Sequence, residues 1–360
     1  MELKSLFSLN IYFCLSALIT LNSAAPGATT RISPSDYEWH ALPAIPSPRQ
    51  EQSVVAVGNR VYIIGGITSN FSYTSDTLNE PVELQPVKDV EFYDIEQRSW
   101  GSAAPLPVSI NHGNVASVGG KIYLLGGLSG ANMSTWNNLA NSYVYDPSLD
   151  TWTEIAPMPE GTARGGAAVG VYGSTIILAG GLTKLDLTGN HDQLSVNFVS
   201  SYDTKTNKWS TSFPSLPGAR DHVAGAVIGH TFYVTGGRDL GQYNTRNNTW
   251  ALDLTSPSLS WVEKAPLPTA RGGLASVAIR QYLFTFGGEG NTMDPNGVFN
   301  NTEVYDTVND SWLIGPPMSL PRHGTNAVAI GPEIFIPGGG ILIAAGPVNA
   351  STVYRPKVMW

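Results

Sequence analysis

The strongest constraint on the fold is a strand-like segment ending in two glycines, which recurs six times along the chain. Its first copy, GNRVYIIGG, covers positions 58 to 66, and apolar side chains alternate up to the glycines. The units are 51 to 61 residues apart, and their glycine pairs begin at Gly65, Gly126, Gly180, Gly236, Gly287 and Gly338. A repeat of this length predicts an array of similar structural units.

Two further landmarks hold their position relative to each glycine pair. An arginine stands 16 residues before the first glycine in five units, and the second unit has Ile110 there. A Tyr-Asp pair precedes four tryptophans by seven residues, whereas the fourth unit has Leu252-Asp253 and two extra residues, which leaves one edge-strand register open. A tryptophan lies 26 to 28 residues before every glycine pair, at Trp39, Trp100, Trp152, Trp209, Trp261 and Trp312.

Each unit predicts four short antiparallel strands, which in the first unit are SVVAV, RVYIIGG, VEFYD and SWGSA. Four strands in a repeat of about 50 residues form a propeller blade. We therefore predict an all-β, six-bladed β-propeller as the single domain of residues 25–360. The expected blades are about 49–103, 110–155, 164–212, 220–264, 271–315 and 322–356 plus 37–42.

The last unit predicts how the ring closes. It supplies its first three strands, of which STVYRP at 351–356 is the third, and little chain remains for a fourth. The segment YEWHAL at 37–42 carries a tryptophan strand without the other three. We expect this N-terminal strand to complete the last blade, because an unpaired sheet edge invites aggregation.

The double glycine, the tyrosine and the tryptophan at these spacings resemble the repeat of the Kelch family, over about residues 36 to 356. The resemblance implies a Kelch-type propeller like the central domain of galactose oxidase. Copper radical oxidases of that kind carry a cysteine crosslinked to a tyrosine, and the only cysteine here is Cys14, near the N-terminus. We therefore do not expect a copper radical oxidase. Sialic-acid mutarotases, plant specifier proteins and secreted fungal Kelch proteins also look similar, but their catalytic residues cannot be aligned here.

The first 24 residues predict a secretory signal peptide. Lys4 precedes an apolar run from Leu6 to Leu21, and small residues follow, with cleavage expected near Ala24. A membrane anchor is the alternative, but the run is shorter than the roughly 20 residues that span a bilayer. We expect a secreted protein with no membrane association after cleavage. Glycosylation is expected at Asn70, Asn132, Asn247, Asn300, Asn309 and Asn349.

Charge and motifs exclude several functions. The net charge is -8 with 20 basic residues, so no nucleic-acid partner is expected, because phosphate binding needs a basic face. No phosphate-binding loop, G-x-S-x-G nucleophile or local Cys/His ligand spacing is present. We therefore expect no cofactor and no metal.

Candidate site residues gather on one face. Loops between the second and third strands of each blade share that face with the crossings between blades, so the repeated arginines are expected there, near the central channel. Guanidinium groups would suit a carboxylate or an oxygen-rich ligand. Alternatively, they brace loops through backbone carbonyls. The candidate ligand-binding residues are Arg49, Arg164, Arg220, Arg271, Arg322, His112 and Arg238.

The candidate catalytic residues are His222, His323, Glu289 and Asp239, because a histidine beside a carboxylate moves protons near neutral pH. The alternative is that they make ordinary polar loop contacts. Aromatic residues in the long loops, Tyr73, Trp136 and Phe299, would wall a pocket or only pack the loops down.

Two functions follow. The first is a secreted enzyme acting on a small, oxygen-rich or anionic molecule in the pore, as a cofactor-independent isomerase, cyclase or lyase of secondary or sugar metabolism. The alternative is a non-catalytic module that binds a glycan or a protein through the long-loop face.

Overall fold

The computed structural model describes residues 32–69, 84–130, 135–186 and 193–358. The expected signal peptide 1–24 with Cys14, the candidate Tyr73, and the sequons at Asn70 and Asn132 lie outside the described residues. The chain divides into Met1–Ile32 and Ser33–Trp360, and the strands belong to the second unit. Within the described residues, no helix has the length and apolar character needed to span a bilayer.

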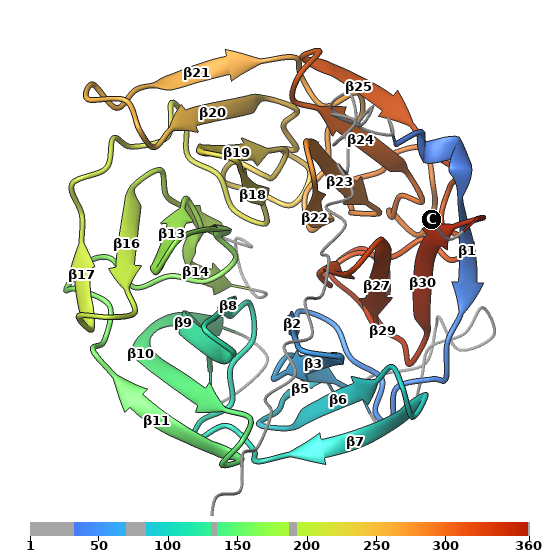
Figure 1. Ribbon diagram of the computed structural model, residues 1–360, viewed down its shortest axis with the longest axis horizontal. Coiled ribbons are helices and arrows are strands. Elements are labelled where there is room, and N and C mark those ends of the chain that lie inside the picture. The colour runs from blue at the N-terminus through green and yellow to red at the C-terminus, as the bar shows by residue number, and fades with distance from the viewer. Residues whose placement is uncertain (1–31, 70–83, 131–134, 187–192, 359–360) are drawn as a thin grey trace, which may run out of the picture. The chain divides into compact units, whose positions relative to one another are not determined.

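Five blades are built from consecutive segments, each around four antiparallel strands (Figure 1), and a hairpin from the third segment adds two strands to the sheet of the second blade. The innermost strand of each blade comes first in the chain, and the outermost carries the tryptophan. In chain order they are β2 (Ser53–Val57), β3 (Arg60–Ile64), β6 (Val90–Asp94) and β7 (Ser99–Ala103); β8 (Asn114–Val118), β9 (Lys121–Ser129), β10 (Thr135–Asp146) and β11 (Thr151–Ile155); β12 (Ala168–Tyr172), β13 (Thr175–Ala179), β16 (Val199–Asp203) and β17 (Lys208–Ser210); β18 (Ala224–Ile228), β19 (Thr231–Thr235), β20 (Thr249–Asp253) and β21 (Trp261–Lys264); β22 (Ala275–Ile279), β23 (Tyr282–Phe286), β24 (Thr302–Asp306) and β25 (Ser311–Ile314).

The sixth blade joins the two ends of the propeller unit. Its order is β26 (Val328–Ile330), β27 (Glu333–Pro337), β30 (Ser351–Pro356) and β1 (Tyr37–Ala41), which follows the 3-10 turn η1 (Pro34–Asp36). β1 pairs antiparallel with β30, with Trp39 opposite Tyr354. The innermost strands contact one another in the closed cycle β2, β8, β12, β18, β22 and β26. The predicted six-bladed propeller and its closure by an N-terminal strand are confirmed.

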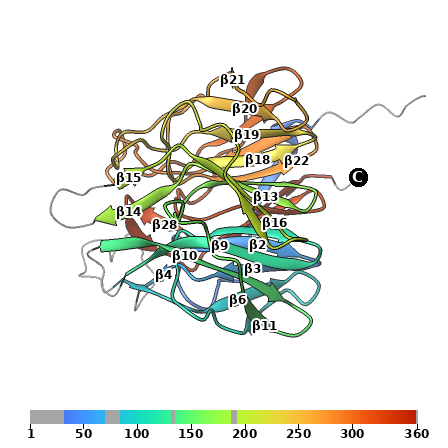
Figure 2. The ribbon, with the colours of Figure 1, turned by 90° about the vertical axis from the view of Figure 1, so that its left-hand side faces the viewer.

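Short hairpins extend the loops that follow the glycine pairs. They are β4 (Ile67–Thr68) with β5 (Gln85–Pro86), β14 (Leu182–Asp186) with β15 (Gln193–Ser195), and β28 (Gly340–Leu342) with β29 (Ala345–Pro347). Figure 2 shows β4, β14, β15 and β28 on one side of the blades. This side is called the loop face below. The open register of the fourth unit is resolved, because Leu252 lies opposite Trp261 as Tyr93 lies opposite Trp100.

The tryptophans connect neighbouring blades. The indole N–H of all six donates to a backbone carbonyl next to the preceding blade, at 2.9 to 3.0 Å. In the fifth blade, for example, Trp312 donates to the carbonyl of Ala265 and its ring lies 5.2 Å from that of Tyr305. The repeated tryptophan therefore both fills space and satisfies backbone groups between blades.

The glycine pairs let adjacent blades approach closely. The Gly288 N–H donates to the carbonyl of Arg322 in the next blade at 2.9 Å. Gly287 has φ 57°, and a Cβ there would lie 2.1 Å from the same Arg322 carbonyl oxygen. Gly288 has φ 112°, and a Cβ there would lie 2.9 Å from the Gly272 carbonyl oxygen, so a larger residue fits neither position, which explains why the pair recurs.

The sequence led us to expect the repeated arginines near the central channel. The structure places them inside the blades instead. Each is at most 4% exposed, and its guanidinium binds groups of its own blade. Arg164 Nε donates to the Gly180 carbonyl at 2.5 Å, and Arg271 Nε does the same to Gly287 at 2.7 Å. The strand that ends at a glycine leaves carbonyls unpaired, and the guanidinium satisfies them. The five are Arg49, Arg164, Arg220, Arg271 and Arg322.

Candidate functional site

A ring of backbone hydrogen bonds surrounds the channel at its loop-face end. In each blade the residue two positions after the arginine position donates its N–H to the carbonyl of the equivalent residue in the preceding blade. The six bonds measure 2.6 to 3.0 Å and close on themselves. This feature, called the backbone ring below, comprises Glu51, His112, Gly166, His222, Gly273 and Gly324.

The backbone ring demands a left-handed conformation. Its φ angles lie between 49° and 63°, which glycine adopts freely, and three of the six residues are glycines. Glu51, His112 and His222 adopt the same conformation at a cost of about 1–3 kcal/mol each. Because glycine serves the ring equally well in the other blades, these three side chains require a reason of their own.

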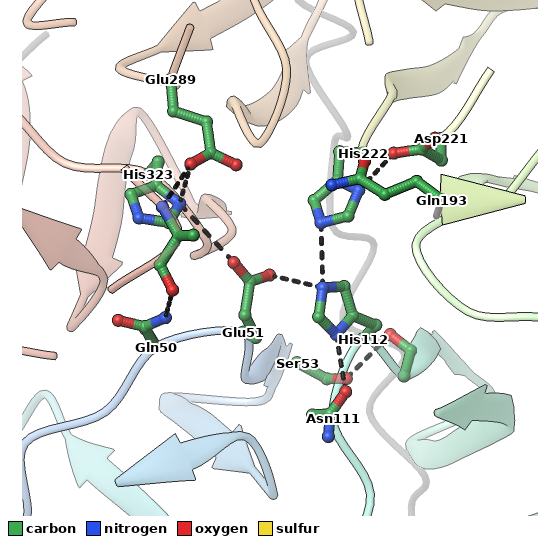
Figure 3. Close-up of polar contacts among 12 residues, drawn as sticks. Gln50, Glu51, Ser53, Asn111, His112, Gln193, Asp221, His222, Glu289 and His323 are labelled. Atoms are coloured by element: carbon green, nitrogen blue, oxygen red, sulfur yellow. Dashed lines mark hydrogen bonds and ion pairs between the residues drawn. The ribbon is translucent and has the colours of Figure 1, made fainter. Parts of the chain in front are cut away.

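The three strained residues place their side chains together at the end of the channel (Figure 3). His112 Nε2 lies 2.9 Å from His222 Nε2 and 3.2 Å from Glu51 Oε2. Their side chains are between 3% and 10% exposed. The strain of the backbone ring thus brings a carboxylate and two imidazoles into one buried cluster.

Each of the two imidazole rings has a polar partner at Nδ1, on the side away from the cluster. His112 Nδ1 lies 2.6 Å from Asn111 Oδ1, and His222 Nδ1 lies 2.5 Å from Asp221 Oδ1. Asp221 also accepts from Arg238 Nε and from the Ser195 hydroxyl. Both partners offer an oxygen acceptor, which the tautomer with its proton on Nδ1 satisfies, and in that tautomer both Nε2 atoms present lone pairs to the cluster.

A second group of ionisable side chains, His323, Glu289 and Arg238, lies next to Glu51. His323 Nδ1 lies 3.5 Å from Glu51 Oε1 and 3.4 Å from Glu289 Oε2, while its Nε2 donates to the Leu342 carbonyl at 2.7 Å. Arg238 Nη1 donates to Glu289 Oε1 at 2.7 Å. Burial alone would lower the pKa of His323, but Glu289 and Glu51 raise that pKa to about 9. This imidazole is therefore protonated at neutral pH.

The carboxyl groups of the cluster have lowered pKa values. Burial alone would raise the pKa of the Glu51 carboxyl, but His112, His323 and His222 hold that pKa well below its ordinary value. The pKa values of Asp221 and Glu289 are also lowered, against the effect of burial, by their histidine and arginine neighbours. Burial lowers the pKa of His112 to about 4. The cluster therefore holds three carboxyl groups that are ionised at neutral pH.

Two cavities meet at the cluster. The channel has a volume of about 250 Å³ and apolar walls that include Val54, Val169 and Leu274. A cavity of about 20 Å³ lies on the loop-face side, beneath Trp136 and Arg238. Glu51, His112 and His222 line both, so they form the wall between them. The smaller cavity has room for one water-sized group.

Several buried polar atoms around the smaller cavity have no partner within the described chain. They include Gln50 Oε1, Trp136 Nε1 and Gln242 Nε2, all from residues that line it. Unpaired buried groups are costly, so they indicate that a bound molecule or water completes this site.

The sequence analysis located part of the cluster. His112, His222, Arg238, Glu289 and His323 converge, whereas Asp239 stands apart and pairs with Arg246 at 3.2 Å. The candidate Trp136 lines the small cavity with its ring centre 5.8 Å from that of His112, and Phe299 is not among the cavity-lining residues of the described chain.

Glu51 and the backing residue Asn111 were missed. The signal lay in the alignment of the six units, where the position of Glu51, His112 and His222 is glycine in the other three. The expectation of no metal-ligand cluster rested on local spacing. Within the described residues, Glu51, His112 and His222 form a group whose ligand atoms lie within 4.8 Å of one another, and they come from three different blades.

Kelch-repeat families match most of the chain. A family model described as the KLHDC2/KLHL20/DRC7 Kelch-repeats domain matches residues 112–339, and the Kelch motif matches residues 48–107. Kelch-like protein terF of Aspergillus terreus is 36% identical over 96% of this chain and 73% of its own length. Kelch-like protein 40 of Xenopus laevis is 30% identical over 56% of this chain, which spans only 29% of that relative.

A solved structure supports the fold independently. The structure of YjhT superposes with a TM-score of 0.68 at 17% identity, covering 87% of this chain and 95% of that one. At that identity the likeness concerns the propeller fold alone.

Proposed function

The chain belongs to the Kelch-repeat family of β-propellers, and we propose that it is an enzyme that acts on a small molecule bound in its central channel. The reaction takes place where Glu51, His112 and His222 close the channel. The observation that carries the proposal is that these three residues accept backbone strain at positions where glycine serves the fold. Strain of this kind is retained where the side chain has a function.

The cluster suits an isomerase, cyclase or lyase. Such reactions move protons and polarise carbon–oxygen bonds, and a carboxylate with two imidazole nitrogens supplies both kinds of group within 2.9 to 3.2 Å. Apolar side chains of the channel wall, such as Val54 and Val169, would pack against a bound substrate.

The first expectation was a small, oxygen-rich or anionic ligand. Its anionic alternative rested on the repeated arginines, and those guanidinium groups are buried in the blades. The Glu51 carboxylate, which lines the channel, repels an anion. A neutral, oxygen-bearing organic molecule fits the apolar walls and the polar end together.

The test uses thermal unfolding with a panel of neutral sugars, lactones and phenols, followed by NMR of any compound that raises the midpoint. Val169→Trp fills the channel without touching the cluster, and Val262→Trp on the exposed surface is the matched control. We expect Val169→Trp alone to abolish binding and product formation. Binding that survives Val169→Trp, or binding without product, would argue against an enzyme of the channel.

A binding module remains a second candidate because of the loop face. Exposed apolar side chains lie in its loops in three successive blades: Leu194 at 45%, Leu240 at 61%, Tyr243 at 63% and Met293 at 91% exposure. The first two loops are linked, since the Leu240 N–H donates to the Ser195 hydroxyl at 2.9 Å. Substituting Leu240 and Tyr243 with serine should then remove partner binding while leaving channel ligands unaffected.

Secretion and glycosylation are also proposed. They are supported by the N-terminal pattern of residues 1–24 and by the sequons, of which Asn247, Asn300 and Asn309 have exposed side chains and Asn349 a half-buried one. Expression in a eukaryotic host tests both. Protein recovered from the medium should begin near Ala25 and lose mass on enzymatic deglycosylation, whereas an intact N-terminus retained in cells would contradict secretion.

A further inference from the structure

The two Nε2 atoms of His112 and His222 face one another at 2.9 Å, so either a proton or a cation bridges them. Both Nδ1 atoms lie within hydrogen-bond distance of an oxygen acceptor, which the tautomer protonated at Nδ1 satisfies. Two lone pairs at that distance repel, so the arrangement calls for a shared proton or a cation. A carboxylate oxygen of Glu51, 3.2 Å from His112 Nε2, adds a third electron-pair donor to the same point.

The donor set is that of a catalytic transition-metal site. Two imidazole nitrogens and one carboxylate bind zinc in catalytic centres and leave a fourth position open. With metal–ligand bonds of about 2.0–2.1 Å, tetrahedral ligand atoms lie about 3.3 Å apart. Two of the three separations, 2.9 and 3.2 Å, are within a few tenths of an ångström of that geometry, and all three ligand atoms lie within 4.8 Å of one another.

The surroundings also match. Metal-binding histidines donate their other N–H to a carboxylate or carbonyl oxygen, which fixes the ring. Asp221 does this for His222 and Asn111 for His112, and Arg238 and Ser195 hold Asp221 in turn. The channel on one side and the small cavity with its unpaired polar atoms on the other give the open position access to a ligand.

We propose that Glu51, His112 and His222 bind one divalent transition-metal ion, with Zn²⁺ as the first candidate, and that its open position faces the channel. This departs from the expectation of a protein without metal. The ion would act as a Lewis acid on an oxygen of the molecule proposed to occupy the channel. Metal binding itself does not depend on that proposed function.

The test measures metal directly. The full protein is stripped with a chelator, its binding of Zn²⁺ and Co²⁺ is followed by calorimetry and, for Co²⁺, by visible absorption, and bound metal is counted by mass spectrometry. We expect one ion per chain and a tetrahedral Co²⁺ spectrum. Glu51→Gln and His222→Gly should each weaken binding at least 100-fold, whereas the exposed His230→Asn should leave it unchanged. Asn111→Ala should weaken affinity 10- to 100-fold while keeping the stoichiometry.

The His222→Gly variant is expected to fold, because the backbone ring already holds glycine at Gly166, Gly273 and Gly324. A loss of metal binding in that variant therefore reports on the side chain and not on unfolding. Absence of Zn²⁺ binding to the wild type, or unchanged binding in folded Glu51→Gln and His222→Gly, would overturn the proposal. Loss of metal in the variants with no ligand binding by any form would uphold the metal and contradict the enzyme. Ligand binding and turnover by stripped protein would uphold the enzyme and contradict a role for the metal in it.

Discussion

His112 Nε2 and His222 Nε2 lie 2.9 Å apart although the two residues are 110 positions apart in the chain. Each belongs to the backbone ring, and each adopts a left-handed backbone conformation. The same backbone hydrogen bond therefore recurs in all six blades at this end of the channel. In three blades the residue that makes it is Glu or His instead of glycine, and these three side chains form the cluster.

The backbone ring predicts an inverted ranking of glycine and alanine. At His112, φ is 53°, so His112→Gly should be more stable than His112→Ala by about 1 kcal/mol. Urea unfolding of both variants measures the difference. Ala168→Gly in β12, where the backbone is extended, should instead destabilise. An alanine variant at 112 that equals or exceeds the glycine variant would contradict the strain.

In several blades one side-chain oxygen accepts hydrogen bonds from a tyrosine hydroxyl and from a backbone N–H of the preceding blade. This arrangement, called the clasp below, predicts how two substitutions change stability. The Tyr305 hydroxyl donates to Asp310 Oδ1 at 2.5 Å, and the same oxygen accepts the Ala265 N–H of the preceding blade at 2.8 Å. Asp150 does the same in the second blade and Asn207 in the third. Asp310→Asn should therefore change stability little, whereas Asp310→Ala should cost about 1 kcal/mol in chemical unfolding. Equal losses in both variants would refute the clasp.

The same clasps predict a pH dependence of stability. The tyrosine hydroxyl, and next the backbone N–H, lower the pKa of Asp150 and of Asp310. A carboxyl whose pKa is lower in the folded state stabilises fully above its unfolded pKa, near 3.9, and loses that contribution as pH falls through the folded value. Unfolding midpoints from pH 7 to 2.5 should fall less steeply in Asp150→Asn/Asp310→Asn than in the wild type; parallel curves would contradict this.

Ring closure predicts the result of a truncation. Removing the chain through Ala41 deletes β1 and exposes the edge of β30. An unpaired edge recruits other chains, so the truncated protein should self-associate in size-exclusion chromatography with light scattering. Trp39→Ala keeps the strand but removes the indole bond to Pro316, so it should lower stability without causing association. A monomeric truncated protein of unchanged stability would show that β1 is dispensable.

The buried pair Arg271–Glu303 predicts a structural rather than ligand-binding role for the repeated arginines. Arg271 Nη1 lies 2.5 Å from Glu303 Oε2, and both side chains are at most 1% exposed. Arg271→Met should destabilise by about 3–5 kcal/mol because it leaves a buried carboxylate unpaired. Arg271→Met/Glu303→Gln should recover much of that loss in urea unfolding. Normal stability of the single variant together with lost ligand binding would restore the ligand role.

The propeller was predictable because its determinants repeat in the sequence. Glycine pairs and tryptophans serve backbone contacts between blades, so every blade needs them at the same position. The site could not be predicted from the repeat, because it lies at positions where the blades differ. Glu51, for example, occupies a position that is glycine in three units. The arginines were misplaced because no pattern of spacing reveals whether a guanidinium points to a channel or to its own blade's carbonyls.

The most direct measurement compares the wild type with the triple variant Glu51→Gly/His112→Gly/His222→Gly. Circular dichroism and thermal unfolding, with and without Zn²⁺ and the panel of neutral ligands, are recorded for both. If the three side chains serve function rather than fold, the variant keeps the propeller and unfolds at or above the wild-type midpoint, because the backbone strain is relieved, but it loses every ligand-induced shift. A variant that fails to fold, or one that retains the shifts of the wild type, would contradict the account.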